Sequence, residues 1–158
     1  MEGILICVAI AVLLFVSAYL TRRRFGLLGL ALAAGSILSG IWGYDAGLIA
    51  SGLGFPTGSL TTAVTLAIIV LLPAGVLLFH GYIYKTFIGR IVGAALFTLL
   101  ALAFLIEPLG HVLMPQGFGA DVYDWLSQNR TAIIGGGLIA AVIDLFLTKP
   151  ASEKRGRR

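Results

Sequence analysis

Asp144 is the residue of this chain whose type and position most suggest chemistry. It is the one carboxylate inside a long apolar segment, in the stretch IAAVIDLFLTK. An ionisable side chain at membrane depth often marks a proton or ion pathway. Asp144 lies only three residues before Leu147, however, so we expect it near the end of its segment, where water or a basic neighbour such as Arg90 can satisfy it. We therefore predict a structural ion pair, with a role in transport as the alternative.

The remaining reactive side chains do not combine into a catalytic or metal-binding pattern. His80 and His111 are the only histidines, and the orientation argued below puts them on opposite faces of a membrane. Glu107 and His111 have helical spacing, but Pro108 lies between them and no third ligand is evident. The single cysteine, Cys7, excludes an intrachain disulfide. With no nucleophile–base pair and no phosphate-binding glycine motif, we predict no enzyme, metal or cofactor.

The composition indicates that lipid is the solvent of this chain. Of its 158 residues, 59% are hydrophobic and 11% are charged, whereas soluble domains carry roughly a quarter charged residues. The mean hydropathy is +1.03. The net charge of +4 comes from too few and too localised residues for a nucleic-acid groove. We therefore predict an all-α, polytopic transmembrane helix bundle, because helices satisfy their own backbone in hydrocarbon.

Five apolar segments are long enough to cross a bilayer. We place them at residues 4–20, 27–50, 60–79, 91–106 and 131–147, the second ending either at Ile41 or at Ala50. A basic tail follows at 149–158. The first segment has the acidic flank Met1-Glu2 and its arginines come after it, so we expect a retained helix rather than a signal peptide.

The distribution of basic residues predicts the orientation. With five spans, ten of the 11 basic residues fall on one side, and only Arg130 falls on the other. Short cationic loops orient insertion towards the cytoplasm. We therefore predict an inner-membrane protein with its N-terminus outside and its C-terminus in the cytoplasm. The residues that carry this signal include Arg22, Arg23, Arg24, Lys85, Arg90, Lys149, Lys154 and Arg155. A second role for the arginine triplet, in binding anionic lipid or a cytoplasmic partner, is the alternative.

Two outer connections interrupt the spans. Residues 43–59 are rich in glycine and contain Pro56, so we expect a frayed helix end there, with a short interfacial or re-entrant piece as the alternative. In the connection 107–130, Pro108 and Pro115 are expected to break the helix. The stretch ADVYDWLSQN then predicts a short amphipathic helix, anchored at the headgroups by Trp125 and Tyr123.

Proline and small residues inside the spans suggest how the helices pack. Pro73 lies in the middle of the third span and predicts a static kink, with a gating hinge as the alternative. Small side chains recur at helical spacing, which lets helices approach closely within one chain or between copies. These residues are Gly35, Ser39, Gly40, Gly89 and Gly93.

Two stretches resemble the CvpA family of bacterial colicin V production proteins: TRRRFGLLGLALAAGSILSGIWGYDAG and FIGRIVGAALFTLLALAFLIEPL. In that family a Gly/Arg-rich cytoplasmic turn leads into a glycine-bearing second helix, and an Arg-x-x-Gly, here Arg90 to Gly93, opens the fourth. The chain departs from the pattern at Gly89, where an acidic residue is usual, and in its fifth helix. The resemblance covers roughly residues 4–106 and implies an inner-membrane protein of secretion or envelope homeostasis.

These features predict an accessory membrane protein that acts non-enzymatically, with the lipid bilayer, other membrane proteins or a second copy as partners. A small oligomeric channel or transporter is the alternative, supported by Pro73, Asp144 and the broken segment 43–59. Almost no polar residue lies in the middle of a span to line a polar path, and this favours the accessory role.

Overall fold

The computed structural model describes residues 2–79, 86–110 and 118–147, and every element in these ranges is a helix. In chain order the elements are α1 (Glu2–Thr21), α2 (Phe25–Ile41), α3 (Ala46–Gly52), α4 (Ser59–Phe79), α5 (Phe87–Leu109), α6 (Phe118–Gln128) and α7 (Arg130–Leu147). The predicted all-α bundle is therefore confirmed for the described part of the chain. The predicted residues Lys85, Lys149, Lys154 and Arg155, and both histidines, lie outside these ranges.

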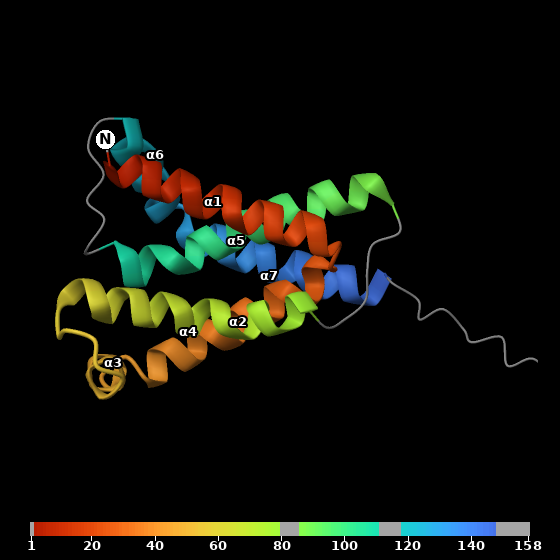
Figure 1. The fold of residues 1–158 in the computed structure, drawn as a ribbon. Helices are drawn as coiled ribbons and strands as arrows, with labels where there is room; N and C mark the ends of the chain where they lie inside the picture. The colour runs from red at the N-terminus through yellow and green to blue at the C-terminus, as the bar shows by residue number, and fades with distance from the viewer. Residues whose placement is uncertain (1, 80–85, 111–117, 148–158) are drawn as a thin grey trace, which may run out of the picture.

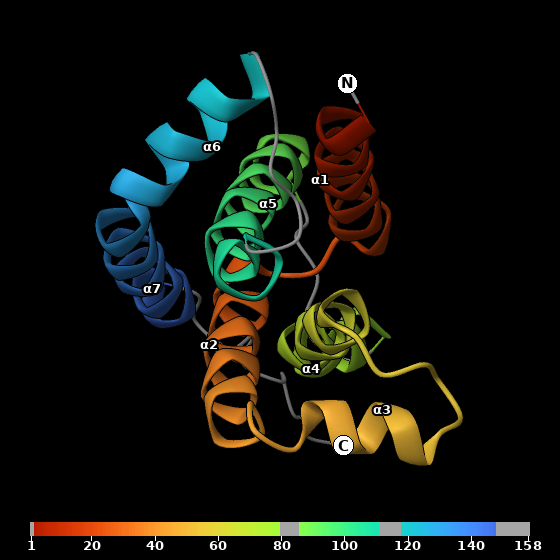
Figure 2. The same ribbon diagram turned by 90° about the vertical axis from the view of Figure 1, so that its left-hand side faces the viewer.

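The five long helices lie side by side, and the short helices α3 and α6 sit at one end (Figure 1). α2 and α5 pack against each other, and both contact α4 and α7, while α1 packs mainly on α5. Figure 2, seen along the bundle from the end that carries α3 and α6, shows α1 and α4 on one side of the α2–α5 pair and α7 on the other. Each long helix thereby buries one face and leaves the other outside.

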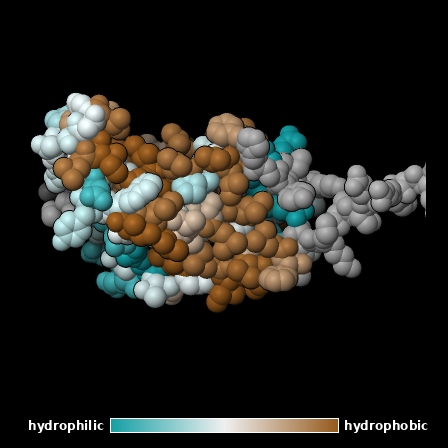
Figure 3. Space-filling view, turned by 90° about the horizontal axis from the view of Figure 1, so that it is seen from below, coloured by the Kyte–Doolittle hydropathy of each residue, from teal (hydrophilic) through white to brown (hydrophobic). Residues whose placement is uncertain are grey.

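The apolar residues are distributed for a lipid environment. The largest fully buried side chains belong to Phe25, Phe97, Leu28, Leu32, Leu100 and Val70. Many equally apolar side chains point outward, and Figure 3 shows brown across the middle of one face, with the teal residues gathered towards the ends. No buried side chain in the described part of the chain is polar or charged. Helices that are apolar on their outer as well as their inner faces suggest a bundle embedded in a membrane.

Glycine lets α2 approach its two neighbours closely. A Cβ atom placed on Gly26 would lie 2.6 Å from the carbonyl oxygen of Ala141 in α7. One placed on Gly35 would lie 2.8 Å from the carbonyl carbon of Val70 in α4, and closer still to the carbonyl oxygen. Such distances are far below van der Waals contact, so both helix pairs depend on the missing side chain.

Length and composition qualify α4 and α5 as membrane spans among the described residues, and four spans result if each of two bent pairs counts as one. The bent pairs are α2 with α3, at 87°, and α6 with α7, at 63°. The apolar part of α1, Leu5–Thr21, is shorter. The described helices therefore support a helical bundle with two to four candidate membrane spans, and the five spans predicted from the sequence are not confirmed.

Two helix boundaries differ from the sequence-based expectation. The segment beginning at Leu27 does not continue straight to Ala50, because the chain turns after Ile41 and α3 runs as a separate short helix. The chain therefore forms a short separate helix, as in the alternative interpretation, rather than a frayed end, and Ala46 and Ala50 of α3 are buried. Pro108 does not break α5, which ends at Leu109. Because α5 ends one residue after Pro108, the missing N–H group and the proline ring affect only its last turn.

Candidate functional site

Charged side chains gather at the end of the bundle opposite α3 and α6, and they bond to the backbone at helix ends. Arg23 shows this most clearly. Its Nε donates a hydrogen bond to the carbonyl oxygen of Leu78 at 2.9 Å, and its Nη2 donates to that of Phe79 at 2.7 Å. Phe79 is the last residue of α4, and the last carbonyls of a helix have no partner within it. Arg23 therefore caps α4.

Arg90 bonds to the end of α1 in the same way. Its Nη2 donates to the carbonyl oxygen of Tyr19 at 3.2 Å, and its guanidinium carbon lies 4.5 Å from the centre of the Tyr19 ring. The ring stacks on Phe15 with centroids 6.2 Å apart and meets Phe87 edge-on. A cation over an aromatic face is attracted to the ring quadrupole. This contact ties the start of α5 to the end of α1.

Asp144 bonds to the N-terminus of a helix, whereas the two arginines bond to C-termini. Its Oδ2 accepts a hydrogen bond from the backbone N–H of Gly26 at 3.0 Å, in the first turn of α2. The side chain of one helix thus supplies the N-terminal cap of another. A carboxylate is favoured at a helix N-terminus by the free N–H groups and by the helix dipole. Arg90, the basic residue that the sequence analysis named as an example of its partner, contacts Tyr19, and the ion pair of Asp144 stays a prediction.

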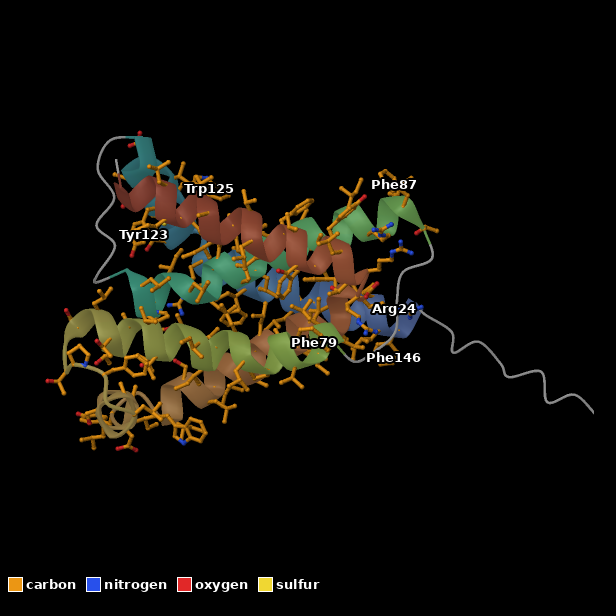
Figure 4. All side chains as sticks on the ribbon, viewed as in Figure 1. Arg24, Phe79, Phe87, Tyr123, Trp125 and Phe146 are labelled. Atoms are coloured by element: carbon orange, nitrogen blue, oxygen red, sulfur yellow. The ribbon has the colours of Figure 1, made fainter. Side chains whose placement is uncertain are left out.

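The turn between α1 and α2 is formed by the arginine triplet itself. Arg22 has a φ of +55°, which is the left-handed conformation that commonly ends a helix. Its side chain is exposed, and Arg24 occupies the N-cap position of α2 with an extended backbone. Figure 4 places Arg24 at the same end of the bundle as Phe79, Phe87 and Phe146. The triplet therefore connects two helices and caps a third.

The other end of the bundle carries an ion pair at its surface. Arg130, the first residue of α7, pairs with Glu107 in the last turn of α5, and its Nε also donates to the carbonyl oxygen of Ala103 at 3.2 Å. The Glu107 side chain is 68% exposed, so the pair is accessible to solvent. Asp45, Asp121 and Asp124 lie on the same end, where acidic residues were expected.

A cavity of about 580 Å³, with both hydroxyl-bearing and apolar residues in its lining, opens beside this ion pair, between the ends of α2, α4 and α5. One wall is formed by Ser36, Ser39 and Gly40 of α2, with Gly43 just beyond its end, and the other by Ser59 and Thr62 of α4. Its inner part is apolar, and Glu107 and Pro108 of α5 lie at its rim. The full lining is Ser36, Ser39, Gly40, Gly43, Ser59, Thr62, Ala63, Leu66, Val70, Phe104, Glu107 and Pro108.

The residues predicted to pack helices divide into two groups. Gly35 makes a close interhelical contact, Gly93 is buried on α5, and Gly89 is half-buried. Ser39 and Gly40 instead line the cavity, and a Cβ atom on Gly40 would meet nothing within 4 Å. Sequence analysis missed Gly26, although its spacing from the neighbouring Gly29 is typical of a packing face.

Pro73 and Trp125 lie inside helices at the places where the sequence predicted a helix. Pro73 lies inside α4, which is a single helix from Ser59 to Phe79. Trp125 lies on α6, and its side chain is 57% exposed, whereas Tyr123 turns inward against Gly110. Trp125 alone of the two is therefore placed to reach a membrane surface.

The described residues contain no group of three or more His, Cys, Asp or Glu side chains that could hold a metal ion. The charged groups at the arginine end bond to the backbone, and the cavity at the other end presents hydroxyl groups. This arrangement can stabilise a bundle and hold a small molecule. Comparison with family models, curated proteins and solved structures finds no match to the chain.

Proposed function

We propose that this chain is a five-span inner-membrane protein that acts as a non-enzymatic accessory factor, through partners, in secretion or envelope homeostasis. The observation that carries the proposal is the absence of any buried polar or charged side chain among the described residues. A protein that moves ions through itself needs polar groups along the path. Apart from the cavity between α2, α4 and α5, the interior formed by the described residues is packed with apolar side chains, and their charged groups lie at the ends.

The five-span arrangement is supported by the way the charges separate. Among the described residues, Arg22, Arg23, Arg24 and Arg90 lie at one end of the long helices, and Asp45, Glu107, Asp121 and Asp124 lie at the end that carries α3 and α6. α2 has 17 residues, which corresponds to about 25 Å of helix. This is slightly less than the roughly 30 Å of hydrocarbon in a bilayer, a difference that local thinning accommodates at modest cost. The basic end then faces the cytoplasm.

Cysteine labelling tests this topology directly. In a Cys7→Ala background, single cysteines replace Leu53, between α3 and α4, and Ile88, at the start of α5; both side chains are more than 70% exposed. A membrane-impermeant maleimide added to intact cells should label position 53 and should reach position 88 only after the membrane is opened. The reverse pattern would invert the orientation, and labelling of both positions from outside would exclude the proposed alternation.

The accessory role is separated from transport by two measurements. Reconstituted vesicles should show no proton or ion flux above protein-free vesicles. In native membranes, a photo-crosslinking residue at the exposed Trp125 position should give a protein adduct of one defined mass, whereas the same residue at buried Phe97 should give none. A robust flux that Asp144→Asn abolishes in folded protein would favour the channel or transporter instead. The resemblance to the CvpA family supplies the expected setting, secretion or envelope homeostasis.

A further inference from the structure

The cavity between α2, α4 and α5 has the composition of a binding site rather than of a packing defect. Packing defects in apolar bundles are lined by apolar side chains and remain dry. This cavity has hydroxyl groups on two facing walls and a volume of about 580 Å³, within the roughly 300–1,000 Å³ of small-molecule pockets. It was not expected from the sequence, and the accessory role proposed above does not require it.

The hydroxyl groups of Ser36 and Ser39 are available to a ligand. Ser17, Thr65 and Thr98 each donate to the carbonyl oxygen four residues earlier in their helices, which is how hydroxyl groups are usually satisfied in apolar helices. Within the described part of the chain, neither Ser36 nor Ser39 makes such a bond. Both line the cavity, three residues apart on one face of α2. They can therefore donate to, and accept from, a bound molecule.

The charge at the rim favours an uncharged ligand. Glu107 is the one ionisable residue of the lining, and Arg130 already pairs with it. No lysine or arginine contributes to the walls, so a phosphate or carboxylate would be transferred from water without a counter-charge. The desolvation of an unpaired charge is costly, whereas alcohol groups can exchange water for the serine hydroxyls.

The inner part of the cavity favours a hydrocarbon chain. Leu66, Val70 and Phe104 form its apolar side, towards the crossing of α2 and α4 at Gly35. We propose that this cavity binds an uncharged amphiphile, with a hydroxyl-bearing head against Ser36 and Ser39 and a hydrocarbon chain against the apolar side. The same chemistry is present in a glycerol ester of a fatty acid and in an alkyl glycoside.

Gly40 provides a direct test because it lies in the cavity wall and has free space beside it. A Cβ atom placed there meets nothing within 4 Å, so Gly40→Leu fills the cavity without displacing the backbone. Gly136, on α7, has the same open surroundings but does not line the cavity. Gly136→Leu is therefore a matched control for the change in volume and helix propensity.

The probe is a monoacylglycerol that carries a photoactivatable diazirine in its acyl chain, added to the protein in phosphatidylcholine nanodiscs. We expect labelling of the wild type and of Gly136→Leu, and at least about tenfold weaker labelling of Gly40→Leu. Peptide mapping should locate the adduct on α2, α4 or α5. Equal labelling of Gly40→Leu and Gly136→Leu would overturn the proposal, because the probe would then bind elsewhere.

Competition identifies the head group. Unlabelled monoacylglycerol and an alkyl glucoside of equal chain length should both reduce labelling, and the stronger competitor indicates which head the site prefers. Lysophosphatidic acid of the same chain length should compete about tenfold more weakly because its phosphate finds no counter-charge. Stronger competition by the phosphate would overturn the assignment of an uncharged ligand.

A second variant keeps the proposal testable if Gly40→Leu does not fold. Ser39→Ala removes the hydroxyl and adds no atom to the cavity, and its thermal unfolding should match that of the wild type. If Gly40→Leu does not fold, weaker labelling of folded Ser39→Ala supports the site, and unchanged labelling of Ser39→Ala contradicts it. Because these measurements require no protein partner, they can fail while the proposed accessory role stands, and the reverse also holds.

Discussion

Among the glycines of α2 that do not contact α7, Gly35 is the one whose replacement by alanine should destabilise the bundle most. The new Cβ atom would lie 2.8 Å from the carbonyl carbon of Val70 and 3.0 Å from its Cα, against an optimum of about 3.5–4.0 Å between carbons. All the clashing atoms belong to the backbone of α4, so no side chain can rotate away. The two helices must therefore separate by roughly 0.7 Å or more, the shortfall for the carbonyl carbon.

Two opposing effects set the change in the free energy of unfolding that we expect for Gly35→Ala. Overpacking of this kind costs about 1–3 kcal/mol, with the upper value appropriate for a backbone clash. Alanine gains up to about 1 kcal/mol over glycine inside a helix. The net loss is therefore about 2 kcal/mol, or roughly a thirtyfold change in the unfolding equilibrium constant.

Gly40→Ala is the matched control, because it adds the same methyl group to the same helix where nothing lies within 4 Å. It should leave stability unchanged or raise it by up to about 1 kcal/mol. Equilibrium unfolding in mixed micelles, followed by the fluorescence of Trp42 and Trp125, measures both variants. If Gly35→Ala proved as stable as Gly40→Ala, the close crossing of α2 and α4 would be wrong.

The charged residues give three further predictions, all measured by the same unfolding assay. Asp144→Ala should lower the free energy of unfolding by about 1 kcal/mol, because it removes the cap of α2. Asp144→Asn should retain most of the cap's contribution, since an asparagine oxygen also accepts from backbone N–H groups. Equal losses in the two variants would mean that the negative charge is what matters. Arg23→Ala should lose about 1 kcal/mol at the end of α4, and Arg23→Lys should recover only part of it, because a lysine cannot span two carbonyls with a rigid fork. A double-mutant cycle on Glu107 and Arg130 should give a coupling below about 1 kcal/mol, because the carboxylate is 68% exposed; a larger value would place the pair in a dry environment.

The positions of the long helices could be predicted from sequence because apolar runs of this length admit few other structures in lipid. The predicted segment 60–79 agrees closely with α4, and 131–147 with α7. The segment 91–106 falls short of α5 at both ends, because counting apolar residues stops at Arg90 and Glu107. The helical backbone continues past both residues, because the Arg90 side chain extends to the Tyr19 ring and the Glu107 side chain faces solvent.

The cavity could not be predicted because it depends on how two helices cross. Ser36 and Ser39 resemble packing residues in sequence, being small and helically spaced. In the structure Gly35 touches α4, whereas Ser36 and Ser39 face the opening between the helices beyond that contact. Local sequence contains the spacing of small residues but not the point at which α4 meets them. The capping role of Asp144 was missed for a similar reason, because Gly26 is 118 residues away in the chain.

The directions of the helices explain why one acidic residue lies at the basic end. α1 and α4 end there and expose carbonyl groups, so the cations Arg90 and Arg23 are favoured beside them. α2 begins there and exposes N–H groups, so an anion is favoured, and Asp144 supplies it. Arg90 stands in the first turn of α5, where its charge opposes the dipole of its own helix, but its side chain extends to the end of α1. The same arginines that favour a cytoplasmic position during insertion thus also match the helix dipoles once the bundle has folded, and Asp144 needs no role in transport to account for its position.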